Sequence, residues 1–268
     1  EQNNLIILEY PNRFYLLNII LICFSIMSFY DDLKSIHPNI RFFFQLFLIS
    51  FSLPLINIEI INFYFPLKII IIFVIFYWVY TINIINFIDG LDGFLTSYSI
   101  FFFFNCFFYF SFFDSHNFFH YMSLVILFIC IAFLFFNKSP AKLFMGDSGS
   151  IFLGYLIGLL SLYFLSIERV DIMISLICYP FMDCTLTIIN KVFRGKYPWE
   201  RLFDYFFLKP VKIYSKTHNY VLKYFSIYMI GLSLNLCLQI TLNYKYLFIL
   251  SILYTILLLK FYNKKLVI

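Results

Sequence analysis

Residues 67–86 read LKIIIIFVIFYWVYTINIIN, an apolar run with a single charged residue, Lys68, near its start. About 20 such residues are needed for a helix to cross the hydrocarbon core of a bilayer. Further apolar runs of suitable length lie at 14–30, 41–58, 94–113, 122–136, 151–167, 171–190, 220–240 and 245–260. The pattern predicts an all-α fold, a polytopic transmembrane helix bundle with about nine spans. We expect it to form a single domain over residues 1–268.

The composition of the chain also indicates a membrane protein. Its 268 residues are 63% hydrophobic and 12% charged, whereas soluble domains are about 45–50% apolar and about 25% charged. A soluble fold of this composition would have too few charged residues for its surface. The apolar runs are continuous, which favours spanning helices over the alternating strands of a membrane barrel.

The basic residues are distributed unevenly between the two predicted faces of the bundle. If successive loops alternate sides, only four of the 19 Lys and Arg residues lie nearest one face, namely Arg13, Lys68, Arg169 and Lys245. The other 15 lie nearest the opposite face, which the positive-inside rule predicts to be cytoplasmic. The net charge of +5 is thereby explained mostly by orientation, and nucleic acid is not an expected partner.

Aspartates occur in three separate loops of this predicted cytoplasmic face. Asp31 and Asp32 open DDLKSIHPNIRFFFQ (31–45), Asp89 and Asp92 lie in INFIDGLDGF (85–94), and Asp147 lies in AKLFMGDSGSIFLGY (141–155). Mg²⁺ prefers such oxygen ligands, and it usually takes one or two carboxylates while substrate phosphates and water complete its shell. Each motif alone is typical of a turn or a helix cap. All three on one face favour a site for phosphate chemistry.

In this order, the three motifs resemble the polyprenyl-phosphate N-acetylhexosamine-1-phosphate transferases, glycosyltransferase family 4. These bacterial enzymes include the peptidoglycan MraY type and the O-antigen-initiating WecA and WbpL types. The resemblance covers about residues 14 to 240, and the strings DDLKS and PAKLFMGDSGS are closer to the WecA and WbpL branch.

The resemblance implies transfer of a sugar-1-phosphate, expected to be N-acetylhexosamine-1-phosphate, from a UDP-sugar to undecaprenyl phosphate. UMP is released, Mg²⁺ is the expected cofactor, and the product starts a cell-surface polysaccharide such as that of lipopolysaccharide. The implied location is the bacterial inner membrane, with the active site facing the cytoplasm. The expected partners are undecaprenyl phosphate, a UDP-N-acetylhexosamine, the lipid bilayer and a second copy of the chain in a homodimer.

The motif match also implies roles for individual residues. The expected catalytic residues are Asp31, Asp32 and Asp92, the first two on the side of the lipid phosphate. Asp147 and Asp92 are the expected Mg²⁺ ligands. The expected substrate-binding residues are Asn86, Asp89, Lys142, Arg194 and His218.

Asp183, in PFMDCTLTIINKVFRGK (180–196), is predicted to lie inside a membrane span. A carboxylate there is energetically costly, so it indicates either a function or a structural partner, for which Arg194, about three turns away, is a candidate. Both interpretations remain open at this point.

The chain departs from the family pattern in two places. The last long cytoplasmic loop of the family is rich in histidine, whereas Leu202 and Tyr205 occupy the corresponding positions here, and His218 is the candidate substitute. Only one predicted span precedes Asp31, so we expect the chain to lack the N-terminal spans of the family. Two alternatives stay open: a catalytically impaired homologue that binds a polyprenyl carrier, and a membrane transporter that uses Asp183.

Overall fold

The computed structural model describes residues 11–56, 66–197, 205–213 and 215–263. Within these ranges it contains helices and no strand, and nine helices are long and apolar enough to cross a membrane. They are α1 (Pro11–Leu33), α2 (Pro38–Ser52), α3 (Leu67–Phe87), α4 (Phe94–Phe113), α5 (Phe118–Asn137), α6 (Gly146–Ser166), α7 (Val170–Phe193), α9 (His218–Thr241) and α10 (Phe248–Asn263). The spans of α2 and α10 include an adjoining short helix and cover Pro38–Leu55 and Lys245–Asn263. The prediction of an all-α polytopic bundle is confirmed.

Short helical elements occupy several of the connections. They are η1 (Leu53–Leu55), which continues α2, η3 (Phe206–Leu208) and α8 (Lys209–Lys212), which lie between α7 and α9, and η4 (Lys245–Leu247), which precedes α10. Some helix starts follow local capping signals. The side chain of Asn117 accepts a hydrogen bond from Phe119 N (2.9 Å) at the start of α5, and Thr217 Oγ1 accepts one from Tyr220 N (3.3 Å) at the start of α9, as short polar N-cap residues commonly do.

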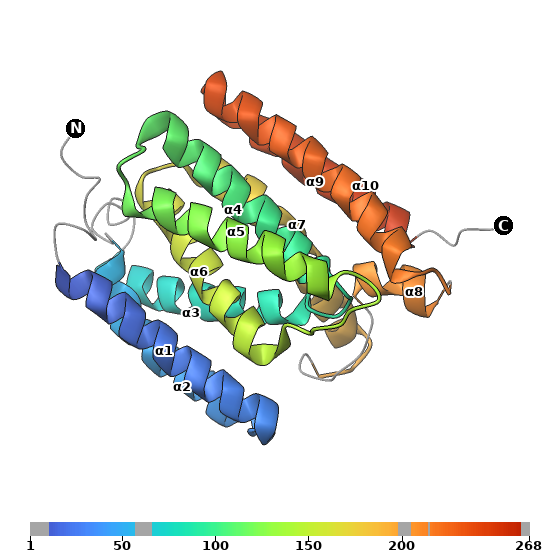
Figure 1. The fold of residues 1–268 in the computed structure, drawn as a ribbon, viewed down its shortest axis with the longest axis horizontal. Helices are drawn as coiled ribbons and strands as arrows, with labels where there is room; N and C mark the ends of the chain where they lie inside the picture. Colours follow the sequence, from blue (N-terminus) through green and yellow to red (C-terminus); the bar gives the residue numbers. More distant parts are fainter. Residues whose placement is uncertain (1–10, 57–65, 198–204, 214, 264–268) are drawn as a thin grey trace.

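Helices α3 and α6 pack closely at the centre of the bundle. A Cβ added at Gly154 would lie 2.9 Å from the Cα of Ile82, and one at Gly158 would lie 2.3 Å from Cδ1 of Trp78. Small residues four apart on one helix allow two membrane helices to approach each other closely. Figure 1 shows α1 and α2 on one flank of the bundle and α9 and α10 on the other.

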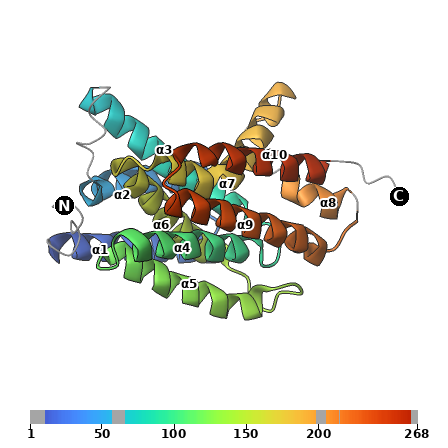
Figure 2. The same ribbon diagram turned by 90° about the horizontal axis from the view of Figure 1, so that it is seen from above.

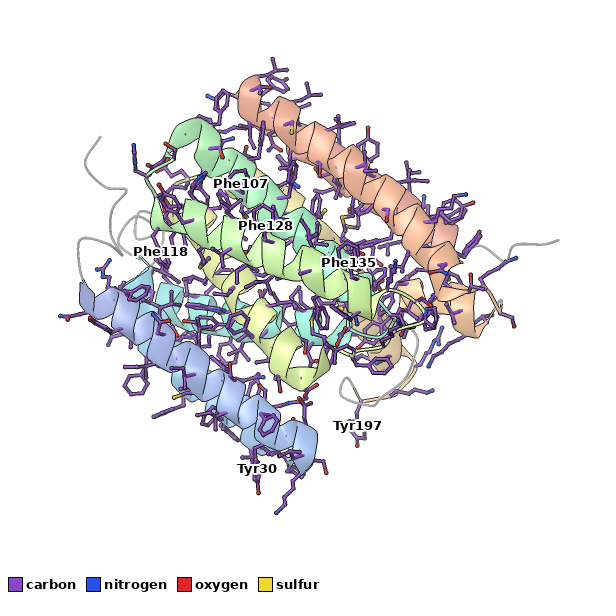
Figure 3. The ribbon with its side chains drawn as sticks, viewed as in Figure 1. Tyr30, Phe107, Phe118, Phe128, Phe135 and Tyr197 are labelled. Carbon is purple, nitrogen blue, oxygen red and sulfur yellow. The ribbon has the colours of Figure 1, made fainter. Side chains whose placement is uncertain are left out.

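Aromatic side chains cover much of the outer surface of the bundle. Phe128 and Phe135 of α5 are 62% and 67% exposed and project outward in Figure 3. Such exposure of large apolar groups suits a lipid environment and is unfavourable in water.

The alternating helices bring four of the loops to one end of the molecule, here called the site end. It holds the turns between α1 and α2, α3 and α4, and α5 and α6, together with the segment between α7 and α9. In Figure 3 the labelled Tyr30 and Tyr197 lie at this end and Phe118 lies toward the other. The last turns of α7 extend away from the bundle in Figure 2, and Phe193 there is 85% exposed.

Candidate active site at one end of the bundle

The last turn of α1, the first turns of α2 and the start of α6 meet at a group of charged side chains. Nη1 of Arg41 in α2 lies 3.0 Å from Oδ2 of Asp31 and 2.7 Å from Oδ2 of Asp147. Oδ1 of Asp31 also accepts a hydrogen bond from Ile36 N (2.6 Å), which fixes the turn after α1. We call Asp31, Asp32, Arg41 and Asp147 the carboxylate cluster. Within it, one cationic nitrogen holds two carboxylates from different helices.

Asp32 has a different role in the geometry, because its carboxylate caps the N-terminus of α6. Oδ1 accepts a hydrogen bond from Asp147 N (3.0 Å), and Oδ2 accepts one from Ser148 N (3.1 Å) and one from Ser148 Oγ (2.6 Å). Helix N-termini carry unpaired N–H groups and a partial positive charge, which a carboxylate satisfies. Gly146, with φ of 65°, precedes Asp147, and a Cβ there would lie 3.0 Å from Oδ2 of Asp32. Glycine therefore allows α1 to approach the start of α6.

Asn86 and Asp89 lie beside the carboxylate cluster at the end of α3. Oδ1 of Asn86 accepts a hydrogen bond from Ser150 Oγ (2.8 Å), which links α3 to the first turn of α6. Burial raises the pKa of Asp89 to about 7, and the negative charge of Asp147 adds to the effect. A carboxyl group with this pKa exchanges a proton near neutral pH and can serve as a hydrogen-bond donor or acceptor for a substrate.

Asp92 belongs to a second group of side chains at the site end. Its Oδ2 accepts a hydrogen bond from Ala141 N (3.2 Å) and lies 3.3 Å from Nδ1 of His218, the first residue of α9. Within the described part of the chain, no hydrogen bond or ion pair joins Asp92 to Asp31 or Asp147. The structure therefore divides the predicted acidic site into two groups, and Asp92 pairs with the predicted substrate-binding residue His218.

The side chain of Asn137 connects the loops that carry this second group. Its Oδ1 accepts hydrogen bonds from Gly93 N (3.1 Å) and Thr96 Oγ1 (2.6 Å), and its Nδ2 donates to the carbonyl oxygen of Leu143 (2.9 Å). Gly93 has φ of 73°, which glycine adopts without strain. Asn137 thereby holds the α3–α4 turn against the α5–α6 loop.

Lys142 and Arg194, predicted to bind the diphosphate, are both exposed at the site end. The backbone of Lys142 is fixed, because its N–H donates to the carbonyl oxygen of Phe136 (2.8 Å). Arg194 directly follows the last turn of α7. Their role as ligands of the substrate stays a prediction.

Asp183 has a structural explanation. Its buried carboxylate accepts hydrogen bonds from Phe206 N (2.9 Å), Phe207 N (3.2 Å) and the hydroxyl of Tyr179 (3.0 Å). It thus anchors η3, whose Phe207 ring would lie 3.3 Å from a Cβ added at Gly90 in the α3–α4 turn. Of the two interpretations, this geometry favours structural support of the segment before α9, and it removes the main reason for considering a transporter.

Of the two positions at which histidine was expected, Leu202 lies outside the described residues. Tyr205 is described, and its ring stacks on Phe207 at a centroid distance of 5.9 Å and lies 5.0 Å from Nζ of Lys191. Tyr205 therefore packs against η3 and the end of α7.

Sequence reasoning did not identify Arg41, although the residue stands in the quoted motif DDLKSIHPNIRFFFQ. The available signal was a cation at the predicted start of the span that follows the Asp pair. Ser148 and Asn137 were also missed, since their roles depend on which loops meet in space.

The carboxylate cluster fits a divalent cation with an incomplete protein shell. Within the described ranges, no group of three or more His, Cys, Asp or Glu side chains is arranged to hold a metal ion. Asp31 and Asp147 nevertheless converge on one cationic nitrogen, and Mg²⁺ usually takes one or two carboxylates and completes its shell with phosphate oxygens and water. The donor set therefore suits a magnesium ion.

Three similar proteins are transferases by name. A probable undecaprenyl-phosphate N-acetylglucosaminyl 1-phosphate transferase of Bacillus subtilis (strain 168) is 45% identical over 75 residues, 26% of this chain and 21% of the relative. Phospho-N-acetylmuramoyl-pentapeptide-transferases of Petrotoga mobilis and Amoebophilus asiaticus are 39% and 40% identical, over 32% and 25% of this chain and 26% and 16% of their own lengths. The aligned stretches thus span about a quarter or less of these relatives.

A family model matches a much longer part of the chain. The model for glycosyl transferase family 4 covers residues 14–165. This match runs from α1 to the end of α6 and includes the carboxylate cluster, Asn86, Asp89 and Asp92, whereas Asp183, Arg194 and His218 lie beyond it. Because the match covers more than half of the chain, the chain belongs to glycosyl transferase family 4.

Proposed function

We propose that this protein transfers a sugar-1-phosphate from a UDP-sugar to undecaprenyl phosphate at the cytoplasmic face of the bacterial inner membrane. N-acetylhexosamine-1-phosphate is the proposed group, Mg²⁺ the cofactor and UMP the second product. The lipid-linked sugar would start a cell-surface polysaccharide, as in O-antigen or related synthesis. The protein would act as a homodimer.

The observation that carries this proposal is the carboxylate cluster at the site end, in a chain of this family. The end also holds most of the basic loops, which favours a cytoplasmic orientation. The donor would be dissolved in the cytosol and the acceptor phosphate would lie at the membrane surface. A cluster at the ends of spanning helices is accessible to both.

The reaction requires two anionic phosphates to approach each other. A phosphate oxygen of the lipid carrier would form a bond to the β-phosphorus of the UDP-sugar, while the bond from that phosphorus to the oxygen bridging the α-phosphate breaks. UMP leaves with the bridging oxygen. Because both reactants are negatively charged, positioning and electrostatic stabilisation are the main tasks of the protein.

The residues of the site would have different roles in this reaction. Asp147 and Asp31 would hold the Mg²⁺, which when bound neutralises phosphate oxygens of the donor and acceptor. Asp32 holds the start of α6 and thereby positions Asp147. Asn86, Asp89 and Asp92 would bind the nucleotide part, with Asp92 oriented by its contacts to Ala141 N and His218.

An apolar groove between α3, α7 and α10 supports a lipid acceptor. Its volume is about 700 Å³, and its lining residues include Phe73, Tyr77, Tyr80, Ile177 and Phe181. Tyr80 lies six residues before Asn86 on α3, which corresponds to about 9 Å along a helix. On α7 the lining runs from Met173 to Met182, in the half of the helix away from the site end. The groove therefore lies within the membrane, where a polyprenyl chain would lie.

The direct test is a transfer assay with purified protein in detergent. Labelled UDP-N-acetylglucosamine, UDP-N-acetylgalactosamine and other UDP-sugars are each incubated with undecaprenyl phosphate and Mg²⁺. We expect a lipid-linked diphosphosugar and UMP in equal amounts with one of these donors, and loss of both products when EDTA removes the metal. Release of UDP in place of UMP, or no transfer from any donor, would contradict the proposal. Light scattering of the same preparation tests the homodimer.

A further inference from the structure

Arg41 holds the carboxylate cluster together in an unusual way. A single nitrogen, Nη1, contacts both Asp31 (3.0 Å) and Asp147 (2.7 Å). An arginine bound bidentately to one carboxylate uses two nitrogens in parallel. Here the guanidinium instead acts as a point charge between two carboxylates, which is the position that a metal ion would take.

The two carboxylates need a cation at this position. Two negative charges brought close together repel each other unless a cation lies between them or one of them is protonated. The neighbouring Asp32 does not compete for this cation, because its oxygens already accept hydrogen bonds from three donors at the start of α6. Arg41 is therefore the cation that keeps Asp31 and Asp147 close together when no metal is bound.

We propose that Arg41 is an exchangeable counter-ion of the metal site. It neutralises Asp31 and Asp147 until a divalent cation binds between them, and its guanidinium then turns to a phosphate oxygen of the UDP-sugar. This inference rests on the proposed function, because it assumes a divalent ion at Asp147 and a diphosphate beside it.

The position of Arg41 suits such an exchange. It lies in the first turn of α2, after Pro38, so its backbone is fixed by the helix while its long side chain has several rotatable bonds. The side chain is 19% exposed and that of Asp147 is 28% exposed, so the pair is open to an incoming ion. A guanidinium released from a carboxylate retains the planar fork of donors that matches a phosphate group.

A fixed structural role for Arg41 predicts the opposite result. If Arg41 only supported the ligands, its removal would disorder them and weaken metal binding. If it competes with the metal for the same carboxylates, its removal would strengthen metal binding and weaken diphosphate binding. The two roles thus differ in the sign of a measured affinity.

The test uses the full chain in detergent, stripped of metal, at pH 8, with Mn²⁺ as the probe and electron paramagnetic resonance as the readout. We expect Arg41→Gln to bind Mn²⁺ about tenfold more tightly than wild type, because a unit charge a few ångströms from the ion is removed. Arg41→Lys keeps the charge and should bind Mn²⁺ nearly as wild type does. Lys34→Gln removes an exposed cation from the turn before α2 and should also resemble wild type.

A second measurement tests whether Arg41 contributes to binding of the UDP-sugar once the metal is bound. With saturating Mn²⁺, we expect Arg41→Gln to bind UDP-N-acetylglucosamine about tenfold more weakly than wild type in calorimetry. Weaker or unchanged Mn²⁺ binding by Arg41→Gln would overturn the inference, as would unchanged binding of the UDP-sugar. Equal tightening in Lys34→Gln would also overturn it, because the effect would then be one of net charge.

A failure of the proposed function and a failure of the exchange give different experimental results. If wild type binds Mn²⁺ and UDP-N-acetylglucosamine and Arg41→Gln shifts both as expected, but no donor is transferred to undecaprenyl phosphate, the exchange stands and the proposed acceptor is wrong. If Asp147→Asn keeps the Mn²⁺ affinity of wild type, the assigned metal ligand is wrong, and the proposed exchange of Arg41 for a metal ion is wrong as well.

Discussion

Arginine and aspartate meet at both ends of the helical bundle, in two different geometries. At the end opposite the site, Nε and Nη2 of Arg169 donate to the two carboxylate oxygens of Asp171, each at 3.1 Å. Gln239 of α9 adds a third hydrogen bond to this carboxylate (2.8 Å). At the site end, one nitrogen of Arg41 serves both Asp31 and Asp147.

The two sites differ in how many donors and cations each carboxylate has as partners. The Arg169–Asp171 pair is buried and bidentate, and it joins the start of α7 to α9, as a structural ion pair does. In the carboxylate cluster, two carboxylates share one cation, and that of Asp147 is partly open to water. The first arrangement stabilises helix packing, whereas the second has carboxylate oxygens that another cation can use.

The largest expected effect is on activity at the site end. Asp147→Asn removes the proposed metal ligand and should lower the rate of sugar-phosphate transfer by about 10³-fold or more, because electrostatic stabilisation of the phosphates is lost. The thermal unfolding midpoint should stay close to that of wild type, since the pair is partly exposed. Asp114→Asn, at the opposite end of the bundle, is the matched control and should keep nearly full activity. An active Asp147→Asn variant would contradict the assignment of Asp147 as a metal ligand at the site end.

At the opposite end, the expected effect is on stability. Asp171→Asn leaves the buried Arg169 without its charge partner and should lower the free energy of unfolding by about 3 kcal/mol. Unfolding in mixed detergent and SDS measures this difference. The double variant Arg169→Gln with Asp171→Asn removes both charges and should regain more than half of the loss. The interpretation fails if the single variant is as stable as wild type.

The membrane spans of this molecule can be predicted from its sequence, but one helix start cannot. The spans follow from the apolar runs alone, and the run 94–113 coincides with α4. Helix α6 begins at Gly146 rather than at 151, because Asp32 from another helix caps its first turn. A partner so distant in sequence leaves no local signal at the start of the helix.

The candidate site could be predicted only in part, because some of its contacts join residues that are far apart in the sequence. Loop alternation placed the Asp motifs at one end, as the structure shows. It did not reveal that Asp92 pairs with His218 and not with the carboxylate cluster, because the D-x-x-D spacing carries no information about the start of α9. The bridging role of Arg41 depends on the mutual approach of α1, α2 and α6, which no single stretch of sequence encodes.

A smaller effect is expected at the capping residue of the cluster. Asp32→Ala removes the acceptor for two N–H groups of α6 and should lower the free energy of unfolding by about 1–2 kcal/mol. Activity should fall as well, because Asp147 loses its support. Asp32→Asn keeps an acceptor oxygen and should recover part of the stability but, lacking the negative charge, less of the activity. Equal stability of the alanine variant and wild type would show that Asp32 does not cap α6 in solution.

The smallest expected effect concerns the pH dependence of stability. The pKa of Asp89 is raised from 3.8 to about 7 by burial, so between these values the folded state binds more protons than the unfolded state. Stability attributable to this group is therefore full below about pH 4 and is lost as the pH rises toward 7. We expect metal-free Asp89→Asn to be about 1 kcal/mol more stable than wild type at pH 8. The two proteins should converge below about pH 4, and parallel curves would contradict this assignment.

The carboxylate cluster is the proposed reaction centre. Fe²⁺ bound in place of Mg²⁺, with ascorbate and peroxide, cleaves a polypeptide close to the metal, and mass spectrometry locates the cuts. We predict cleavage near residues 31–32 and 145–148 that excess Mg²⁺ suppresses. Cuts near Asp171, or cuts that Mg²⁺ does not suppress, would contradict the claim.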